Sequence, residues 1–365
     1  MTENLLWDEF PALYRKLLPT WFGQSYEPEA LATCRDCAMC RPNPGRHKIA
    51  TYQPHLKCCT FYPDLPNYLV GALLSDTDPA TAEGQKRVRN LIQQRSGVSP
   101  YGVNAPLLRE LLYAHAGGDA FGNSETLLCP YFHRENHNCS IWRYRNAVCS
   151  TFFCKYNDGR AGEAFWQSVK EYLGFVQGLL SEVALERLNF PSNALPANPM
   201  KRLVGRNTRL SAADLDGRVD DATWYKLWGD YAGREDAFFI ACYREISQLT
   251  PDDLATLGGF EERRHAAKVQ AAKRAVDYPQ LPPVLHRNPS VRIHEEREQH
   301  IVVEGFNGLT EMPILLWRFI QTCSGEETEQ TIAAFETKHG LEIEEDLIIN
   351  MVQNRFLLAE EELAG

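Results

Sequence analysis

The sequence predicts a mainly α-helical chain in which a cysteine-rich region of loops and helices precedes a helical segment and a small C-terminal unit. Three observations support this. Apolar residues recur at helical spacing along most of the chain, two cysteine clusters interrupt that pattern before residue 160, and two proline-rich stretches divide the remainder. The expected domains are a cysteine-cluster domain over 1–190, a helical extension and linker over 191–285, and a C-terminal domain over 286–365.

Composition places the chain among globular proteins, with 365 residues of which 44% are hydrophobic and 24% charged. The sequence shows neither a signal-like N-terminus nor eighteen uninterrupted apolar residues, so we expect a cytoplasmic protein with no membrane partner. Disulfides are rare in that reducing compartment. The eleven cysteines are therefore expected to be metal ligands or redox groups.

Charge is unevenly distributed along the chain. Residues 290–365 hold five basic and sixteen acidic residues, which accounts for essentially the whole formal net charge of −10. The segments around the cysteines are basic instead. Basic side chains near the cysteines could offset the negative charge of a thiolate-bound cluster, or attract an acidic partner or anionic substrate. They include Arg35, Arg46, Lys48, Arg143 and Arg145.

Helical periodicity predicts one or two short helices over 3–18 and helices at about 83–95 and 105–116. A long helix is expected over about 165–188, and further helices over 211–276. Prolines and a glycine between Arg41 and Lys57 predict a loop there. Two cysteines outside the clusters, Cys242 and Cys323, lie in apolar helical patterns and are expected to be core residues.

The C-terminal domain has its own pattern. Strands are expected near 291–294 and 300–303, then a turn at 305–308, helices at about 312–322, 326–338 and 343–353, and a short apolar end. Two strands, three helices and a terminal strand is the order of a winged helix. The candidate recognition helix at 344–353 is acidic, which disfavours DNA as a partner because phosphate contacts need Lys or Arg.

This segment, with Asn288-Pro-Ser-Val-Arg-Ile, Ile314-Leu-Leu-Trp-Arg-Phe-Ile and Asp346-Leu-Ile-Ile-Asn-Met-Val, resembles the PqqD-like winged-helix domains. The resemblance covers about 75 residues. It implies a domain that holds a leader or substrate peptide for a modifying enzyme. A peptide laid along a strand edge is compatible with the acidic charge.

The first cysteine cluster contains Cys34, Cys37 and Cys40 in a C-x2-C-x2-C run, with Cys58 and Cys59 behind it. Three cysteines so spaced suit the corners of a cubane iron–sulfur cluster better than the paired knuckles of a structural zinc site. A fourth thiolate must then come from elsewhere, and Cys58 or Cys59 is the nearest candidate. Neighbouring residues seldom point to one atom, so the other is expected to serve a different role.

The second cluster supplies a full set of four thiols with aromatic residues between them. Aromatic walls exclude water from a cluster, and donors to its sulfur atoms help to set its potential. The expected cofactor is therefore one or two iron–sulfur clusters, of [4Fe–4S] type, with zinc as the alternative. The thiols of this second set are those of Cys129, Cys139, Cys149 and Cys154.

Histidines keep the zinc alternative open. His133 and His137 with Cys139 would form a mixed nitrogen and sulfur set, and His47 and His55 lie within the first cysteine loop. A Cys–His nucleophile is a weaker interpretation, because so many cysteines compete as ligands. The sequence shows no P-loop and no Ser-His-Asp order that would indicate another chemistry.

The string Cys139-Ser-Ile-Trp-Arg-Tyr-Arg-Asn-Ala-Val-Cys149-Ser-Thr-Phe-Phe-Cys154, preceded by Cys129-Pro-Tyr-Phe, resembles the CxxCxxCC zinc- or iron-chelating (YkgJ-like) family over about 34–160. The resemblance implies metal or iron–sulfur binding, and some relatives are protein lysine methylases. The chain departs from the family in that Cys40 stands alone where a cysteine pair is usual, and the Cys58-Cys59 pair begins 18 positions later. Either Cys40 or this pair could thus supply the third or fourth ligand.

The sequence therefore predicts an iron–sulfur protein with a redox or cluster-dependent modifying role on a protein or peptide partner. As an enzyme it would be methylase-like or an oxidoreductase. Two alternatives remain, a zinc-stapled binding module without catalysis and a redox or iron sensor.

Overall fold

The computed structural model describes residues 4–26, 28–29, 37, 39–40, 52–116, 118–190, 212–216, 218 and 220–364. The protein is mainly α-helical, as predicted, and it divides into two compact units. The first contains Met1–Pro28, Ala50–Phe152 and Lys170–Ala266, and the second contains Glu29–Ile49, Phe153–Val169 and Ala267–Gly365. Each unit is thus assembled from stretches that are separate in the sequence.

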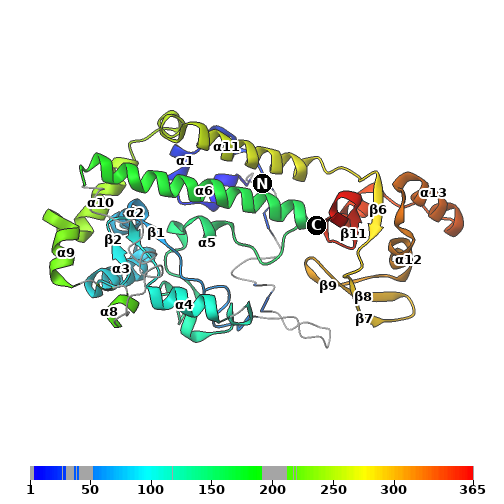
Figure 1. The fold of residues 1–365 in the computed structure, drawn as a ribbon, viewed down its shortest axis with the longest axis horizontal. Coiled ribbons are helices and arrows are strands. Elements are labelled where there is room, and N and C mark those ends of the chain that lie inside the picture. Colours follow the sequence, from blue (N-terminus) through cyan, green and yellow to red (C-terminus); the bar gives the residue numbers. More distant parts are fainter. Residues whose placement is uncertain are drawn as a thin grey trace. The chain divides into compact units, whose positions relative to one another are not determined.

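Figure 1 shows the order of the elements along the chain. The helices are α1 (Tyr14–Leu17), α2 (Asn67–Ser75), α3 (Ala82–Gln94), α4 (Leu107–His115), α5 (Ala147–Thr151), α6 (Gly159–Arg187), α8 (Ala212–Leu215), α9 (Asp221–Trp228), α10 (Glu235–Ile246), α11 (Pro251–Asp277), α12 (Ile314–Thr322), α13 (Thr328–His339) and α14 (Glu345–Gln353). The strands are β1 (Leu65–Pro66), β2 (Val98–Ser99), β3 (Gly102–Val103), β4 (Phe132–His133), β5 (Asn138–Cys139), β6 (Val284–Arg287), β7 (Arg292–Glu296), β8 (His300–Gly305), β9 (Gly308–Pro313), β10 (Ser324–Glu327) and β11 (Leu357–Ala359).

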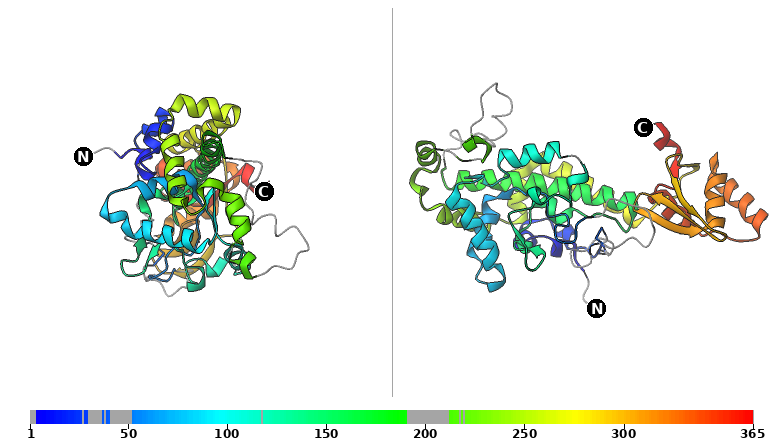
Figure 2. Two further views of the ribbon diagram at one scale, coloured as in Figure 1. Left: turned by 90° about the vertical axis from the view of Figure 1, so that its left-hand side faces the viewer. Right: turned by 90° about the horizontal axis from the view of Figure 1, so that it is seen from below.

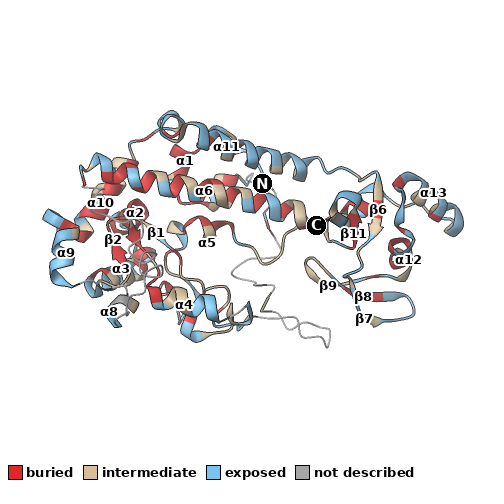
Figure 3. Cartoon of the chain, viewed as in Figure 1, coloured by how far each residue is buried: buried red, intermediate tan, exposed pale blue. Residues whose placement is uncertain are grey.

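Helix α2 forms the centre of the first unit. Its residues from Asn67 to Leu74 are buried, which Figure 3 shows as an almost continuous red helix. The helix packs against α10, and a Cβ atom added to Gly71 would lie 1.8 Å from the carbonyl oxygen of Phe239. No other residue type would permit so close a crossing.

Within the first unit, α6 also packs against α11. The hydroxyl of Tyr172 donates a 2.8 Å hydrogen bond to the buried carboxylate of Glu262, and the ring of Phe175 stacks on His265. Helix α11 is interrupted at Gly259, which has a φ of 55°. These contacts explain why the apolar stripe of α6 is covered, as its helical periodicity predicts.

The second unit contains two antiparallel three-stranded sheets, with strand orders β7-β8-β9 and β10-β6-β11. Figure 2 shows these strands together with α12, α13 and α14 in the C-terminal part of the chain. Strands β8 and β9 pair in register from His300 opposite Pro313 to Gly305 opposite Gly308. The core beneath them includes Ile301, Val303, Trp317, Phe319, Phe335, Ile348 and Phe356.

Three strands of this unit, β6, β9 and β10, were not predicted. Strand β6 lies in the segment expected to be a linker, and β9 occupies the residues between the expected turn and the expected helix. Strand β6 is defined by pairing with the distant strands β10 and β11, which local periodicity does not report, whereas β9 forms a tight hairpin with β8. The predicted strands near 291–294 and 300–303 are confirmed as β7 and β8, and the three predicted helices as α12, α13 and α14.

In the described ranges, no helix is both long enough and apolar enough to cross a membrane. Most of the loop predicted between residues 41 and 57 lies outside the described residues.

Candidate thiol centre

Five thiols from three separate segments meet in the first unit. Cys58 and Cys59 follow a turn that begins at Gln53, Cys129 precedes a β-hairpin whose second strand contains Cys139, and Cys149 lies in α5. Besides burial, negative charge on Cys58, Cys129 or Cys139 raises the pKa of the Cys149 thiol. The same three charges also raise the pKa of the Cys59 thiol, in addition to its hydrogen bond with Cys58 and its burial. The thiols are therefore electrostatic neighbours although up to 91 residues separate them in the sequence.

Backbone hydrogen bonds join two of the segments directly. The amide of Cys129 donates to the carbonyl oxygen of Cys59, with an N···O distance of 2.7 Å. Strands β4 and β5 place Phe132 opposite Cys139, and the amide of Ser140 donates to the carbonyl oxygen of Tyr131 at 2.9 Å. The hairpin therefore holds Cys139 close to the Cys129 loop.

Helix α3 supports both loops from one side. Arg87 donates a 2.8 Å hydrogen bond from Nη1 to the carbonyl oxygen of Pro130. One turn earlier, a Cβ atom added to the buried Gly84 would lie 2.4 Å from the carbonyl oxygen of Ser140. The glycine thus allows the Cys139 loop to approach the helix backbone.

Backbone amides also donate to two of the sulfur atoms. The amide of Tyr131 donates to Cys129 and that of Ile141 to Cys139, and each bond lowers the pKa of the thiol that accepts it. In both cases the donor lies two residues after the cysteine. Such N–H···S bonds stabilise a thiolate in preference to a thiol, which is what a metal ligand requires.

The start of α5 fixes the position of Cys149. The side-chain oxygen of Asn146 caps this helix by accepting a 3.0 Å hydrogen bond from the amide of Cys149. Gln177 of α6 accepts a second bond, 3.1 Å long, from the amide of Ala147. Asn146 is 5% exposed and Gln177 is 8% exposed, so both bonds are shielded from water.

Arg145 places a positive charge beside the thiols. Its guanidinium donates to the carbonyl oxygens of Trp142, Cys149 and Glu9 and lies 3.5 Å from the centre of the Trp142 ring. Its charge lowers the pKa of Cys58, as it does for two other thiols of the group. The arginine is held by several contacts, so its charge is fixed in place.

The protonation of the thiols is set by burial and by their neighbours. Burial raises the pKa of Cys129 to about 12 and also raises the pKa of Cys139 and Cys149. Cys58 differs, because a hydrogen bond with the Cys59 thiol lowers its pKa to about 7. That same bond and burial raise the pKa of Cys59. Without a bound cation most of these thiols are protonated, so binding of a metal would release protons.

The sulfur atoms are neighbours but do not form a closed coordination shell. Among the described residues, no three Cys, His, Asp or Glu side chains are arranged so that they could hold a metal ion directly. Rotation about χ1 moves a cysteine sulfur between staggered positions without moving the backbone. A set of thiols with backbone N–H donors and a fixed arginine fits a soft metal or an iron–sulfur cluster.

Two tyrosines border this group of thiols. The rings of Tyr62 and Tyr131 meet edge to face, with their centres 6.3 Å apart. Burial, and to a smaller extent the charge of Cys129, raises the pKa of both hydroxyls. Each hydroxyl oxygen is buried and has no hydrogen-bond partner within the described part of the chain.

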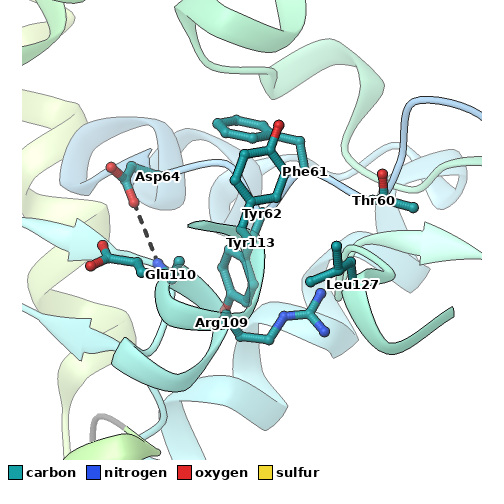
Figure 4. A pocket seen from close by; sticks show the side chains of 9 residues that line it. Thr60, Phe61, Tyr62, Asp64, Arg109, Glu110, Tyr113 and Leu127 are labelled. Carbon is teal, nitrogen blue, oxygen red and sulfur yellow. Dashed lines mark hydrogen bonds between the residues drawn. The ribbon is translucent and has the colours of Figure 1, made fainter. Parts of the chain in front are cut away.

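Figure 4 shows a small cavity that Tyr62 helps to line. Its volume is about 140 Å³, and Arg109 in its lining donates to the carbonyl oxygens of Thr126 and Leu128. A cavity of this size accepts a group as large as one side chain. The residues that line it are Thr60, Phe61, Tyr62, Asp64, Ala105, Arg109, Glu110, Tyr113 and Leu127.

A larger cavity, of about 580 Å³, shares Arg145 with the thiol group. Its lining also includes Trp142, Tyr144, Tyr243 and Asp76. This volume lies in the range of small-molecule sites. Tyr62 thus lines the smaller cavity and Arg145 lines the larger one, and both residues border the group of thiols.

The remaining predicted ligands are Cys34, Cys37, Cys40 and Cys154. Cys37, Cys40 and Cys154 belong to the second unit, where the amide of Cys40 donates to the carbonyl oxygen of Cys37 at 2.9 Å. Cys34 lies outside the described residues. The boundary between the units falls between Phe152 and Phe153, so Cys154 is assigned to the second unit, while Cys129, Cys139 and Cys149 are electrostatic neighbours of Cys58 and Cys59 in the first. The predicted set of Cys129, Cys139, Cys149 and Cys154 stays a prediction.

The two isolated cysteines are core residues, as predicted. Cys242 is fully buried in α10, and Cys323 is 2% exposed with its thiol 3.5 Å from the carbonyl oxygen of Phe319. Among the candidate histidines, Nε2 of His55 lies 3.5 Å from Oε1 of Glu125. Nδ1 of His133 accepts a hydrogen bond from the amide of Asn136. His47 lies outside the described residues.

Sequence reasoning missed Tyr62, Arg109 and Asn146. Tyr62 stands three residues after Cys59, so its proximity in sequence could have suggested it. Arg109 reaches the Cys129 loop through tertiary folding, which spacing does not reveal.

No protein-family model matches this chain, and no curated protein or solved structure matches it either. The two family resemblances therefore remain predictions, and the candidate site depends on the residues and contacts described above.

Proposed function

We propose that the first unit binds an iron–sulfur cluster of [4Fe–4S] type through Cys129, Cys139, Cys149 and one of Cys58 and Cys59. The observation that supports this is the meeting of five thiols from three chain segments. A cluster held by four thiolates would supply electron transfer. The thiol that is left over, from Cys58 or Cys59, remains available for another role.

The surroundings support an anionic centre. Four thiolates give a cubane cluster net negative charge, which Arg145 would offset at fixed distance. The amides of Tyr131 and Ile141 donate to two of the sulfur atoms. Phe132 and Tyr131 are buried beside the cysteines and would exclude water from the cluster.

The proposed reaction is a redox or cluster-dependent modification of a protein or peptide. The 140 Å³ cavity beside Tyr62 has room for one side chain of such a partner, and the larger cavity beside Arg145 has room for a small co-substrate. In the second unit, β7 lies at one edge of its sheet and Ile293 on it is 50% exposed. We propose that this winged-helix-like unit holds the peptide along that edge.

The alternative is a zinc-stapled binding module. Four thiolates with N–H···S bonds would suit tetrahedral zinc equally well. Cys37, Cys40 and Cys154, with Cys34 in the same region of the sequence, would supply the thiols of a second centre in either case.

Metal analysis tests the proposal. Protein purified without oxygen should be coloured, with broad visible absorbance and about four irons and four sulfides per cluster. Colourless protein that contains zinc and no iron would refute the iron–sulfur centre and support the binding module. Protein that binds neither metal would refute both.

A further inference from the structure

The hydroxyl groups of Tyr62 and Tyr131 lack the partners that buried hydroxyls normally have. Both oxygen atoms are buried, and across the described ranges neither makes a hydrogen bond. The whole Tyr131 side chain is inaccessible to solvent. A buried polar group without a partner is destabilising, so its presence needs an explanation, such as a hydrogen-bond acceptor supplied by a bound group.

The backbone fixes Tyr131 between two of the cysteines. Its amide donates to the sulfur of Cys129, and its carbonyl oxygen accepts from the amide of Ser140, which follows Cys139. Tyr131 therefore cannot move away from the thiols without breaking bonds on both sides.

Tyr62 reaches the same place from the other segment. It follows the Cys58-Cys59 pair by three residues, and its ring packs edge to face against that of Tyr131. The charge of Cys129 acts on both phenols, which shows that the two side chains share this electrostatic neighbourhood. Asp64 is a charged neighbour of both as well, yet neither hydroxyl is bonded to it.

We propose that the hydroxyls of Tyr62 and Tyr131 donate hydrogen bonds to sulfur atoms of the bound metal centre. This inference rests on the proposed function, since the sulfur atoms become thiolates or sulfides when the metal binds. An O–H···S bond spreads the negative charge of the sulfur and stabilises the more reduced form of a cluster. The two tyrosines would act as positioning residues, which hold the centre and adjust its potential without touching a substrate.

The test compares Tyr62→Phe and Tyr131→Phe with a matched control, Tyr172→Phe, in the full chain. Tyr172 is also a buried tyrosine of the first unit, but its hydroxyl is bonded to Glu262. Each variant is prepared in metal-free and metal-loaded form. Unfolding midpoints, metal content and, for an iron–sulfur cluster, the reduction potential are measured.

In the metal-free form, Tyr62→Phe and Tyr131→Phe should be as stable as the wild type or more stable, because they remove a buried hydroxyl without a partner. In the metal-loaded form, they should bind metal about 10–100-fold more weakly. An iron–sulfur cluster should also shift to a more negative potential in these variants. Tyr172→Phe should lose stability in both forms and leave metal affinity and potential unchanged.

Two results would overturn the inference while leaving the proposed function intact. One is metal affinity and potential that equal those of the wild type in both tyrosine variants. The other is a loss of metal-free stability as large as that of Tyr172→Phe, which would show that water or another group already satisfies the hydroxyls. A wild-type protein that binds no metal would instead refute the proposed function and, with it, this inference.

Discussion

The amide of Cys129 donates a 2.7 Å hydrogen bond to the carbonyl oxygen of Cys59. This bond joins two cysteine loops whose thiols lie 70 residues apart in the sequence. Because backbone groups make it, the two loops are held together whether or not a metal is bound. A small zinc finger folds only when it binds zinc, so part of the binding energy is used to order the chain. In this protein the loops are already joined, so less of the binding energy of a metal is needed for that purpose.

We expect serine at Cys129, Cys139 or Cys149 to remove most of the bound metal, because serine is a poor ligand for soft metals. Metal content after purification and chelator competition would measure this. Cys242→Ser is the control, since Cys242 is a buried core thiol of the same unit. Unchanged metal content in all three ligand variants would contradict the assigned set.

The N-cap of α5 gives a test of positioning. Asn146→Ala should cost about 1–2 kcal/mol of stability, because the amide of Cys149 loses its partner, and should weaken metal binding about 10–100-fold. Asp220 caps α9 in the same unit by accepting from the amide of Thr223. Asp220→Ala should destabilise the protein without affecting metal affinity. Equal metal affinity in the two variants would mean that the cap does not position Cys149.

The helices could be predicted from the sequence because their apolar residues repeat at the period of the helix itself. The long helix α6 was expected from positions such as Phe165, Val169 and Tyr172, and it begins only six residues earlier than this pattern. Strand β9 was missed because it depends on pairing with β8, and the sequence around Gly308 also suits a turn. Strand β6 was missed for a different reason, since its partners β10 and β11 lie far along the chain and a local pattern does not report such pairing.

All five cysteines of the candidate site were singled out from the sequence, and their role as metal ligands stays a prediction. Cysteine content pointed to soft-metal chemistry, and Cys58 or Cys59 was expected to complete a set begun by Cys34, Cys37 and Cys40. In the structure Cys59 is joined to Cys129 by a backbone hydrogen bond that no spacing rule describes. Cys34 lies outside the described residues, so the set that it begins stays a prediction. Short spacings constrain ligands within one loop, while contacts between loops are decided by tertiary folding.

Two glycines of the first unit allow a matched comparison. Gly84→Ala should cost about 1–3 kcal/mol, because its Cβ would press on the carbonyl oxygen of Ser140 and displace the Cys139 loop. Gly174 is exposed on α6 with no atom within 4 Å of an added Cβ, so Gly174→Ala should stabilise the protein by about 0.5–1 kcal/mol. Chemical unfolding of both variants would measure the difference. The loop displacement also predicts weaker metal binding in Gly84→Ala alone, and metal affinity equal to that of Gly174→Ala would contradict the role of Gly84.

Alkaline pH should destabilise the second unit through Cys323. Burial raises the pKa of this thiol from 9.0 to about 12, so the folded protein keeps it protonated where the unfolded chain does not. Its contribution to stability is complete well below pH 9, begins to fall near pH 9, and is lost at about 1.4 kcal/mol per pH unit as the pH rises from about 10 toward 12. Chemical unfolding at pH 8, 9 and 10 would measure this loss. Cys323→Ser, whose hydroxyl does not ionise in this range, should lose about 1 kcal/mol less than the wild type between pH 9 and 10. Parallel losses in the two proteins would show that Cys323 ionises as readily in the folded state as in the unfolded chain.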